Sequence, residues 1–445
     1  MKTVITYGTY DLLHFGHIRL LERAKELGDY LIVGVTADDF DRRRGKINVQ
    51  QSLMERVEAV KQTGLADEII IEEYEGQKID DIKRYNVDIF TVGSDWEGHI
   101  DYLNEYCDVI YLDRTKGVSS SEIRSNNSSM TMGIVGDNPI LLKYINEDKY
   151  VNGLTITSVT TTNKEIIDYC NNKNIKIYSD YKKMLKEVDS VYVVSSPETH
   201  YEHIKVAFEN NKHVICESPI TPIKEKTLEL YKFARENNLV LMDGIKTAYA
   251  TALNRLILLI KSGKIGKVLS IDCSCSSLEQ LQKIKETEIP NVQNSMCAWG
   301  PTALLAPFLI LGTDYKHHSF NTLYMNEEEK FDLFTNINLL YDSAVVNIKI
   351  GKGYKTEGEL IVSGTKGYIY VPAPWWKTDY FEIRYEKDRE KYFYQLDGEG
   401  IRYELLMFTK SVLNRRKSSY ISEEISVAIS DMVEKFNNKE NLNKF

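Results

Sequence analysis

The sequence predicts an α/β protein with two successive parallel-sheet units, followed by a sheet-rich α+β region. Short apolar runs alternate with amphipathic helical stretches in the first 125 residues, and the same alternation restarts after residue 130. The polar segment SNNSSM between the two series has the composition of a linker. From about residue 268 the apolar runs become longer and contain aromatic residues, as in large sheets. We therefore predict domains at 1–125, 130–250 and 251–445, because 445 residues exceed one domain.

The first motif, GTYDLLHFGH, spans Gly8–His17 between a β-prone run and an amphipathic helical pattern. A helix N-terminus presents free N–H groups and the positive end of its dipole, so a phosphate can bind there. Gly16 allows close approach of the backbone. His14 and His17 lie one helical turn apart, where both imidazoles can donate hydrogen bonds to oxygens around a phosphorus centre. The alternative is a pair of surface histidines that cap a helix.

The second motif, RTKGVSSSEIR, spans 114–124 and follows an apolar strand-like run. It combines a cation, a glycine and three consecutive hydroxyl side chains before a helical stretch. These are the components of an anion site at a loop-to-helix junction. A serine-rich N-cap is the simpler alternative.

Together the two motifs resemble the cytidylyltransferases that make CDP-alcohols, and most closely the glycerol-3-phosphate cytidylyltransferases. The resemblance rests on the HxGH signature at His14–His17, the RTxGISTT-type signature at Arg114–Ser121, the DWEG segment Asp95–Gly98 and the opening KTVITYGTYDLLHFGHIRLLERAKELGDYLIVG. It implies a Rossmann-like nucleotidyltransferase domain with both signatures at the carboxyl ends of strands. In the implied reaction an alcohol phosphate attacks the α-phosphorus of CTP and pyrophosphate leaves. Catalysis then depends on positioning and charge neutralisation.

The resemblance also assigns roles to residues. Catalytic positions are His14, His17, Lys46 and Arg114. Nucleotide-binding positions are Thr9, Tyr10, Asp11, Phe15, Gly16, Asp95, Thr115, Gly117, Ser119, Ser120 and Ser121. Arg44 and Lys78 match acceptor-binding positions, although the basic run DRRRGK also fits a solvated loop. Gly64 stands where relatives often have arginine, so CTP use is better supported than the identity of the acceptor.

From about Met130 the chain resembles the glucose–fructose oxidoreductase and inositol dehydrogenase family. The segments DSVYVVSSPETHYEHIKVAFENNKHVICESPIT, LIKSGKIGKVLSID, CAWGPTALLAPFLILG and GEGIRYELLMF carry the resemblance. It implies a second Rossmann-like domain and an α+β open-faced sheet domain. Three family motifs are altered: G-x-G-x-x-G reads Gly136–Leu141 with Asn138 and Leu141 at glycine positions, E-K-P reads Glu217–Pro219 without lysine, and D-x-G-x-H reads Ala298–Thr302 without histidine.

Three interpretations of this second region follow. It is an NAD(P)-dependent reductase that makes the polyol or its phosphate, a binding module without redox chemistry, or a scaffold. For the reductase, Lys246 is the candidate proton donor, and Glu217 and His200 complete the candidate redox site. A salt bridge from Lys246 to a carboxylate such as Asp243 is the structural alternative.

Composition argues against several classes of function and of binding site. The net charge of −9 argues against nucleic-acid and anionic-membrane binding. The 6 cysteines show no zinc-type spacing, so we expect no resident metal site and reduced thiols. There is no signal-peptide pattern or membrane-length apolar run, and LNRLILLIKSG at 253–263 reads as a buried helix. We expect a cytoplasmic homo-oligomer that uses CTP with Mg²⁺ and a small polyol phosphate, and whose product enters a teichoic-acid-like or capsular polymer.

Overall fold

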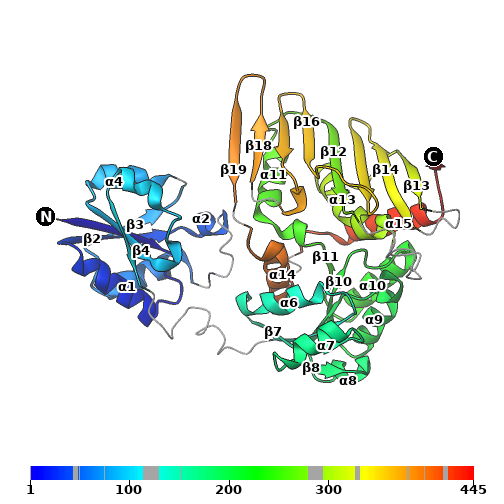
Figure 1. The fold of residues 1–445 in the computed structure, drawn as a ribbon, viewed down its shortest axis with the longest axis horizontal. Helices are drawn as coiled ribbons and strands as arrows, with labels where there is room; N and C mark the ends of the chain where they lie inside the picture. Colours follow the sequence, from blue (N-terminus) through cyan, green and yellow to red (C-terminus); the bar gives the residue numbers. More distant parts are fainter. Residues whose placement is uncertain are drawn as a thin grey trace. The chain divides into compact units, whose positions relative to one another are not determined.

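The computed structural model divides the chain into two compact units, Met1–Ser129 and Met130–Phe445, and each is described by itself (Figure 1). The structure describes residues 2–43, 49, 51–74, 76–113, 130–151, 153–278, 294–325, 331–377, 380–394, 396–413 and 419–445. The division between residues 250 and 251 remains a prediction.

The first unit is a parallel five-stranded sheet in the order β3-β2-β1-β4-β5. This doubly wound order reverses direction between β1 and β4, so ligands are expected beyond the carboxyl ends of these two strands. Apolar side chains pack on both faces of the sheet, around Leu21 and Val33 on one face and Ile82 and Phe90 on the other. The strands are β1 Thr3–Gly8, β2 Tyr30–Thr36, β3 Glu68–Glu72, β4 Ile89–Gly93 and β5 Asp108–Leu112, and the helices are α1 Phe15–Glu26, α2 Asp38–Arg43, α3 Leu53–Gln62, α4 Gln77–Tyr85, η1 Ser94–Trp96 and η2 Asp101–Glu105.

The second unit begins with a parallel six-stranded sheet in the order β11-β10-β9-β6-β7-β8. Its order also reverses at the first strand, here between β6 and β9. Both parallel sheets confirm the α/β fold class. The strands are β6 Met130–Val135, β7 Leu154–Thr160, β8 Lys176–Tyr178, β9 Ser190–Val193, β10 His213–Glu217 and β11 Leu241–Gly244, with helices α6 Leu141–Glu147, η3 Asp148–Tyr150, α7 Lys164–Asn171, α8 Tyr181–Leu185, α9 Pro197–Glu209 and α10 Lys224–Glu236.

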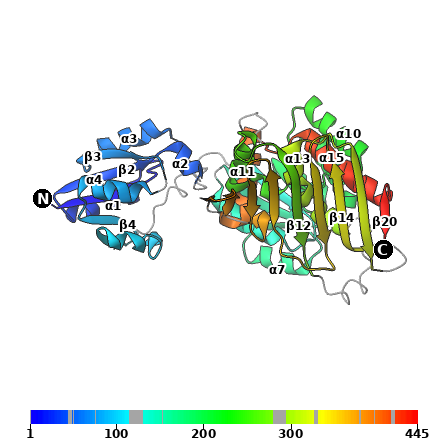
Figure 2. The same cartoon turned by 90° about the horizontal axis from the view of Figure 1, so that it is seen from above.

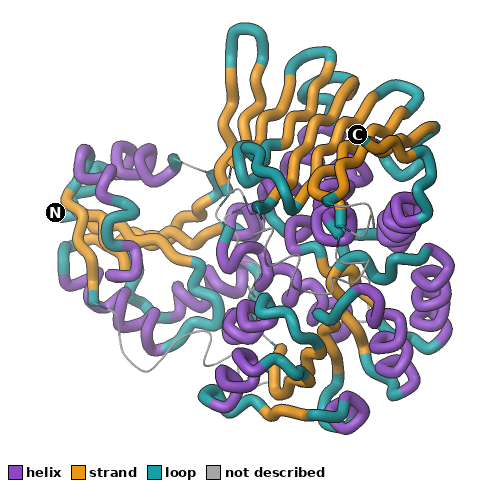
Figure 3. The backbone as a smooth tube through the Cα atoms, turned by 45° about the vertical axis from the view of Figure 1, so that its right-hand side comes forward, coloured by secondary structure: helices purple, strands orange, loops and turns teal. Residues whose placement is uncertain are grey.

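A mixed nine-stranded sheet follows in the order β19-β18-β17-β16-β12-β15-β14-β13-β20 (Figure 2). Helix α13 packs on β12, β14 and β15, and α15 lies between α13 and α10, so it joins the two halves of the unit (Figure 1). In Figure 3 the strands of the large sheet run side by side in one layer, with helices beneath it. The strands are β12 Val268–Ser276, β13 His317–Tyr324, β14 Asp332–Leu340, β15 Val345–Gly351, β16 Leu360–Gly364, β17 Tyr368–Val371, β18 Tyr380–Arg384, β19 Arg389–Phe393 and β20 Leu442–Lys444. The helices are η4 Lys246–Tyr249, α11 Thr251–Lys261, α13 Ser295–Leu311, η6 Trp375–Lys377, η7 Asp397–Gly400, α14 Ile401–Leu413 and α15 Glu423–Asn437.

The apolar segment at 253–263 forms most of α11, which buries Leu253, Leu256 and Ile260 in the second unit. Within the part of the chain that the structure describes, no helix has the length and apolar character needed to cross a membrane.

Candidate functional site

The β1–α1 turn places two histidine rings together at the start of α1. His14 is the N-cap, and its Nδ1 accepts a hydrogen bond from the backbone N–H of Gly16 at 3.1 Å. The rings of His14 and His17 stack with centroids 3.9 Å apart and an interplanar angle of 19°. Because Nδ1 accepts, the proton of a neutral His14 lies on Nε2. The cap therefore fixes the tautomer that can donate a hydrogen bond from Nε2.

Two residues with left-handed backbones shape this turn. Tyr10 and Leu12 have φ values of 53° and 48°, a conformation that costs roughly 1–2 kcal/mol for a residue with a side chain. The ring of Tyr10 packs over Gly8, where an added Cβ would lie 2.9 Å from the ring. Tyr10 also meets His17 edge-on, with ring centroids 5.5 Å apart. Gly8 thus allows Tyr10 to support the histidine pair.

Gln51, which precedes α3, holds the β1–α1 turn through two hydrogen bonds. The backbone N–H of Gln51 donates to Asp11 Oδ1 at 3.0 Å, and the side-chain oxygen of Gln51 accepts from the backbone N–H of Leu12 at 2.7 Å. These reciprocal bonds keep the buried carboxylate of Asp11 close to the turn.

Arg56 of α3 is the buried cation beneath this turn, and its side chain is 0% exposed. Its guanidinium donates to the carbonyl oxygen of Thr9, the residue after β1, at 2.7 Å, and to that of Thr36, the last residue of β2, at 2.8 Å. It also pairs with the carboxylates of Asp38 and Asp41 in α2. One side chain thereby joins two strand ends and a helix. The sequence analysis did not single out Arg56. A signal for it existed, because a charged side chain interrupts the apolar stripe of α3 at this position.

Lys78 of α4 lies at the carboxyl end of β3. Its ammonium pairs with the buried carboxylate of Glu72 and lies 4.9 Å from the ring centroid of Tyr7. Glu72 also accepts from Thr36 Oγ1 at 2.8 Å. Lys78 is therefore a cation held beside the strand ends, with 16% of its side chain exposed.

The other predicted residues of the first unit are distributed as follows. Thr9 donates to Asp41 Oδ1 at 3.0 Å, Phe15 is 56% exposed, and Asp95 is exposed in η1 after β4. Gly64 has a φ of 67° and follows α3, so a helix-terminating turn occupies this position. Arg44, Lys46, Arg114, Thr115, Gly117, Ser119, Ser120 and Ser121 lie outside the described residues.

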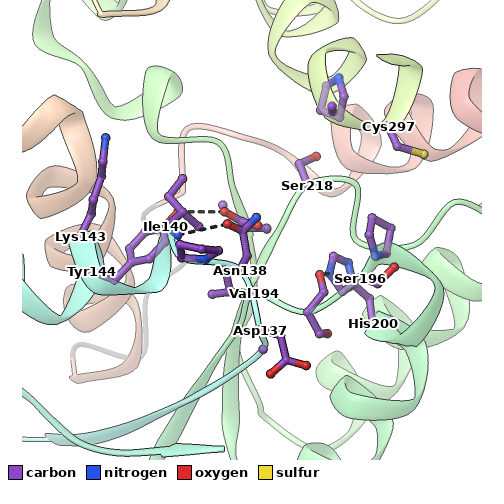
Figure 4. A pocket seen from close by; sticks show the side chains of 18 of the residues that line it. Asp137, Asn138, Ile140, Lys143, Tyr144, Val194, Ser196, His200, Ser218 and Cys297 are labelled. Atoms are coloured by element: carbon purple, nitrogen blue, oxygen red, sulfur yellow. Dashed lines mark hydrogen bonds between the residues drawn. The ribbon is translucent and has the colours of Figure 1, made fainter. Parts of the chain in front are cut away.

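The second unit contains a cavity of about 1100 Å³ at the carboxyl ends of its parallel strands (Figure 4). The β6–α6 turn, the start of α9, the end of β10, η4 and the start of α13 line it, together with residues of η6 and η7. The altered family motifs therefore meet at one cavity, and the candidate redox residues Lys246, Glu217 and His200 all line it.

The β6–α6 turn keeps one glycine of the dinucleotide motif. Gly136 has a φ of 150°, and an added Cβ would lie 2.4 Å from the carbonyl oxygen of Val194. The next residues differ, because Pro139 has no N–H and the N–H of Ile140 donates to Asn138 Oδ1 at 3.1 Å. The N–H of Leu141 donates to the Asn138 carbonyl at 3.0 Å. Two backbone donors of the turn are thus taken up within it and Pro139 supplies none, so the turn offers fewer donors to a pyrophosphate than the unaltered motif would.

Asp137 faces the neighbouring β7–α7 loop. Its Oδ1 accepts from Thr161 Oγ1 at 2.8 Å and from the backbone N–H of Thr162 at 2.6 Å. Partial burial opposes ionisation of Asp137, but these hydrogen bonds hold its pKa below the usual value. In Figure 4 its carboxylate is directed away from Ser218 and Cys297.

His200 and Ser218 lie at the end of β10, and His200 contacts the segment that follows it. The two ring nitrogens of His200 lie 3.0 Å from the Pro219 carbonyl oxygen and 2.9 Å from that of Ser195, and burial lowers the pKa of His200 to about 4. These contacts are typical of a structural histidine. Ser218 replaces the family lysine, and its buried Oγ makes no hydrogen bond to the described residues.

Lys246 lines the cavity and donates to Glu399 Oε2 at 2.9 Å. It does not pair with Asp243, which is buried in β11. Lys143 and Lys377 pair with the same Glu399 carboxylate. Burial opposes ionisation of Glu399, but hydrogen bonds from Lys143 and Lys246 hold its pKa at about 2.

Three acids lie in or next to the cavity: Glu217 lines it, and Glu404 interacts with Glu217 and with Asp243. Glu404 of α14 is 0% exposed and accepts from Tyr192 Oη at 2.5 Å, while Glu217 accepts from Tyr144 Oη at 3.2 Å. Burial raises the pKa of Glu404 to about 8 and that of Glu217 to about 7. Burial likewise raises the pKa of Asp243 to about 6. Protonation of these groups therefore depends on pH near neutrality.

Arg56→Met should destabilise the first unit by about 3–5 kcal/mol, because it leaves carboxylates of α2 without their buried cation. Calorimetric unfolding of the full chain measures this. Arg19→Met is the matched control, because Arg19 forms an exposed pair with Glu22 that contributes less than about 1 kcal/mol. Equal effects of the two substitutions would show that Arg56 does not hold the strand ends.

Glu404→Gln should flatten the pH dependence of stability of the second unit. The pKa of Glu404 is raised on folding, so the free energy of unfolding falls as pH rises from about 4.5 to about 8, by roughly 1.4 kcal/mol per pH unit for one group. Calorimetry at pH 4.5 and 8.5 should show the variant close to wild type at the lower pH and more stable at the higher. Glu236→Gln, at an exposed position, serves as control. If the stability of Glu404→Gln changed with pH as steeply as that of wild type, the raised pKa of Glu404 would be contradicted.

Comparison with known proteins finds a matching family model for each of the two units. The family model "Cytidylyltransferase-like" matches residues 5–126, and "Oxidoreductase family, NAD-binding Rossmann fold" matches 130–245. Glycerol-3-phosphate cytidylyltransferase of Bacillus spizizenii is 48% identical over 130 residues, which cover 29% of this chain and 100% of that protein. The Staphylococcus aureus enzyme of the same name is 48% identical over 128 residues, 28% of this chain and 93% of that one.

The solved structures similar to this chain match the second unit. A 3-ketoreductase from Actinomadura kijaniata, in complex with NADP and TDP-benzene, has a TM-score of 0.64 at 17% identity and covers 71% of this chain and 99% of its own. UDP-N-acetylglucosamine 3-dehydrogenase from Acidithiobacillus ferrooxidans has a TM-score of 0.58 at 14% identity, covering 68% and 95%. At these identities the likeness shows the fold alone. Through its first unit the chain belongs to the glycerol-3-phosphate cytidylyltransferase family and is a nucleotidyltransferase, to which a unit with the fold of the NAD-binding oxidoreductase family is fused.

Proposed function

We propose that the first unit transfers CMP from CTP to a small polyol phosphate, with glycerol 3-phosphate as the acceptor, and releases pyrophosphate. The observation that carries the proposal is the stacked pair of His14 and His17 at the N-terminus of α1. The names of the relatives that are 48% identical support both CTP and the acceptor.

In the proposed reaction a phosphate oxygen of the acceptor attacks the α-phosphorus of CTP. A new P–O bond forms, the bond between the α-phosphorus and the bridging oxygen breaks, and pyrophosphate leaves with the electron pair. The Nε2–H of His14 would donate to a non-bridging oxygen as negative charge develops, and His17 and the dipole of α1 would add to that stabilisation.

Mg²⁺ would enter with CTP as part of the substrate, because it prefers phosphate oxygens and retained waters to an all-protein site. Among the described residues, no group of three or more His, Cys, Asp and Glu side chains could hold a metal ion. Arg114 and Ser119–Ser121 would bind the β- and γ-phosphates, and Thr115 and Gly117 would complete that loop. Thr9, Tyr10, Asp11, Phe15, Gly16 and Asp95 would surround the rest of the nucleotide.

Lys78, Arg44 and Lys46 would supply cations to the phosphate of the acceptor. We further propose that the protein works in the cytoplasm as a homo-oligomer and that its CDP-alcohol enters a teichoic-acid-like or capsular polymer.

For the second unit we favour a ligand-binding role without a redox step. The β6–α6 turn, in which Pro139 and Asn138 remove donors, supports this choice. The alternative is an NAD(P)-dependent reductase that supplies the polyol or its phosphate. Oxidation of NADH or NADPH with dihydroxyacetone phosphate, and its loss in Lys246→Met, would establish that alternative.

Pyrophosphate release from CTP with a panel of polyol phosphates tests the transferase proposal, with mass spectrometry of the product. The panel contains glycerol 3-phosphate, glycerol 2-phosphate and ribitol 5-phosphate. We expect CDP-glycerol from glycerol 3-phosphate. Absence of release with every member would refute the proposal.

His14→Ala and His17→Ala should each lower kcat by about 10²–10³-fold, the usual effect of removing one donor to developing negative charge. Steady-state kinetics with saturating CTP measures this. His14→Asn separates catalysis from capping, because asparagine retains a cap acceptor but lacks the imidazole. If His14→Asn retained wild-type kcat, His14 would only cap the helix.

Lys78→Ala should raise the apparent KM for the polyol phosphate by about tenfold or more, with a smaller effect on the KM for CTP, because a charge-assisted bond to the acceptor is lost. Lys83→Ala on the same helix α4 removes an exposed lysine and serves as control. A rise confined to the KM for CTP would reassign Lys78 to the nucleotide. Thermal unfolding checks the effect of leaving Glu72 without its lysine.

A further inference from the structure

Three lysines from separate elements converge on one carboxylate at the wall of the cavity. Lys143 comes from α6, Lys246 from η4 and Lys377 from η6. Their Nζ atoms lie 3.0, 2.9 and 3.1 Å from Glu399 Oε2 respectively, and Lys143 also donates to Oε1 at 2.9 Å. All four side chains line the cavity.

The cluster is unbalanced in charge and in hydrogen-bond geometry. Three ammonium groups lie within 3.1 Å of one carboxylate oxygen. Glu217 and Glu404 also interact with Lys246, but burial raises the pKa of both, so they compensate the remaining positive charge only in part. A single oxygen, Oε2, serves all three lysines, although each ammonium group has three donors. An anion with more charge and one more oxygen would match the three lysines better.

We propose that Lys143, Lys246 and Lys377 form a binding subsite for the phosphate of a phosphomonoester, whose place Glu399 holds as an internal counter-ion. A phosphomonoester carries a charge of about −1.5 to −2 at neutral pH and has three terminal oxygens, one for each ammonium group. The ligand displaces the Glu399 carboxylate when it binds. This proposal concerns the second unit and does not depend on CMP transfer by the first.

The backbone around Glu399 suits such a displacement. Gly398, Glu399 and Gly400 have φ values of 56°, 54° and 88°, so Glu399 is a left-handed residue between two glycines. Glycine adopts alternative backbone conformations without a steric penalty, so this segment can rearrange. Displacement of the Glu399 carboxylate would also allow its backbone to leave the left-handed conformation, which is costly for a residue with a side chain. The Glu399 side chain is 36% exposed, so it can move into solvent.

The remainder of the cavity indicates the rest of the ligand. Trp299 and Trp376 line it, with ring centroids 4.9 Å apart. Their faces offer apolar contact to the C–H groups of a polyol or sugar, while Thr302 and Ser218 place hydroxyls in the same cavity. The ligand class is therefore a phosphorylated polyol or sugar.

Tryptophan fluorescence of the full chain tests the proposal. Trp96→Phe removes the tryptophan of the first unit, so the remaining signal comes from Trp299, Trp375 and Trp376 of the second. In this background we expect saturable changes with glycerol 3-phosphate and with inorganic phosphate, but none with glycerol. A saturable change with NADPH, and none with either phosphate, would overturn the proposal in favour of the dinucleotide.

Two charge variants in the same background separate a subsite from a structural ion-pair network. Lys246→Met should raise the Kd for glycerol 3-phosphate at least tenfold, and Glu399→Gln should lower it at least threefold because the internal competitor loses its charge. Lys232→Met, an exposed lysine of α10 with 68% of its side chain accessible, should leave the Kd unchanged. Thermal unfolding shows whether each variant is folded. If folded Glu399→Gln bound phosphate no more tightly than the background, or Lys232→Met weakened binding as much as Lys246→Met, the proposal would be wrong.

Discussion

The guanidinium of Arg56 is the interaction on which the nucleotidyltransferase unit depends. Carbonyl groups at the ends of parallel strands lie beyond the last rung of the ladder, and such a group needs a donor when it is buried. Arg56 pairs the carbonyl of Thr9 after β1 and that of Thr36 at the end of β2, and it holds acidic side chains of α2 beside them. The left-handed turn that carries the histidine pair starts from the same carbonyl of Thr9. A buried charge without partners would cost stability, but the guanidinium of Arg56 is paired with carbonyl and carboxylate oxygens. The strand-end carbonyls therefore obtain their hydrogen bonds from within the unit and do not need a nucleotide to supply them.

The second unit keeps its fold while three of its motifs differ from the family pattern. The parallel sheet, the close approach at Gly136 and the large cavity are present. In the β6–α6 turn Pro139 and two internal bonds reduce the donors available to a pyrophosphate, and Ser218 and Thr302 stand at the lysine and histidine positions of the family. Lysines from α6, η4 and η6 converge on Glu399 in this cavity. A cluster of positive charge thus lies around Glu399, and one of its members, Lys143, directly follows the β6–α6 turn in the chain.

Much of this organisation follows from local sequence. The HxGH segment predicts its own N-cap, and the alternation of apolar runs predicts the strands and helices that build both parallel sheets, because each such element depends on residues within a few positions of one another. Interactions between distant segments could not be predicted in this way. Lys246 pairs with Glu399, 153 positions away, and not with neighbouring Asp243. Arg56 could be suspected as a charge on an apolar stripe, but its partners Thr9 and Thr36 depend on the register of β1 and β2. The short strand β20 escaped detection because Leu442–Lys444 contains one apolar residue.

The cap at His14 has a consequence for the orientation of its ring. One lone pair, on Nδ1, both accepts the first N–H bond of α1 and keeps the proton of the neutral ring on the opposite nitrogen. A rotation of the ring that points Nε2–H elsewhere also takes Nδ1 away from the N–H of Gly16. The start of the helix and the direction of this hydrogen-bond donor are therefore set together.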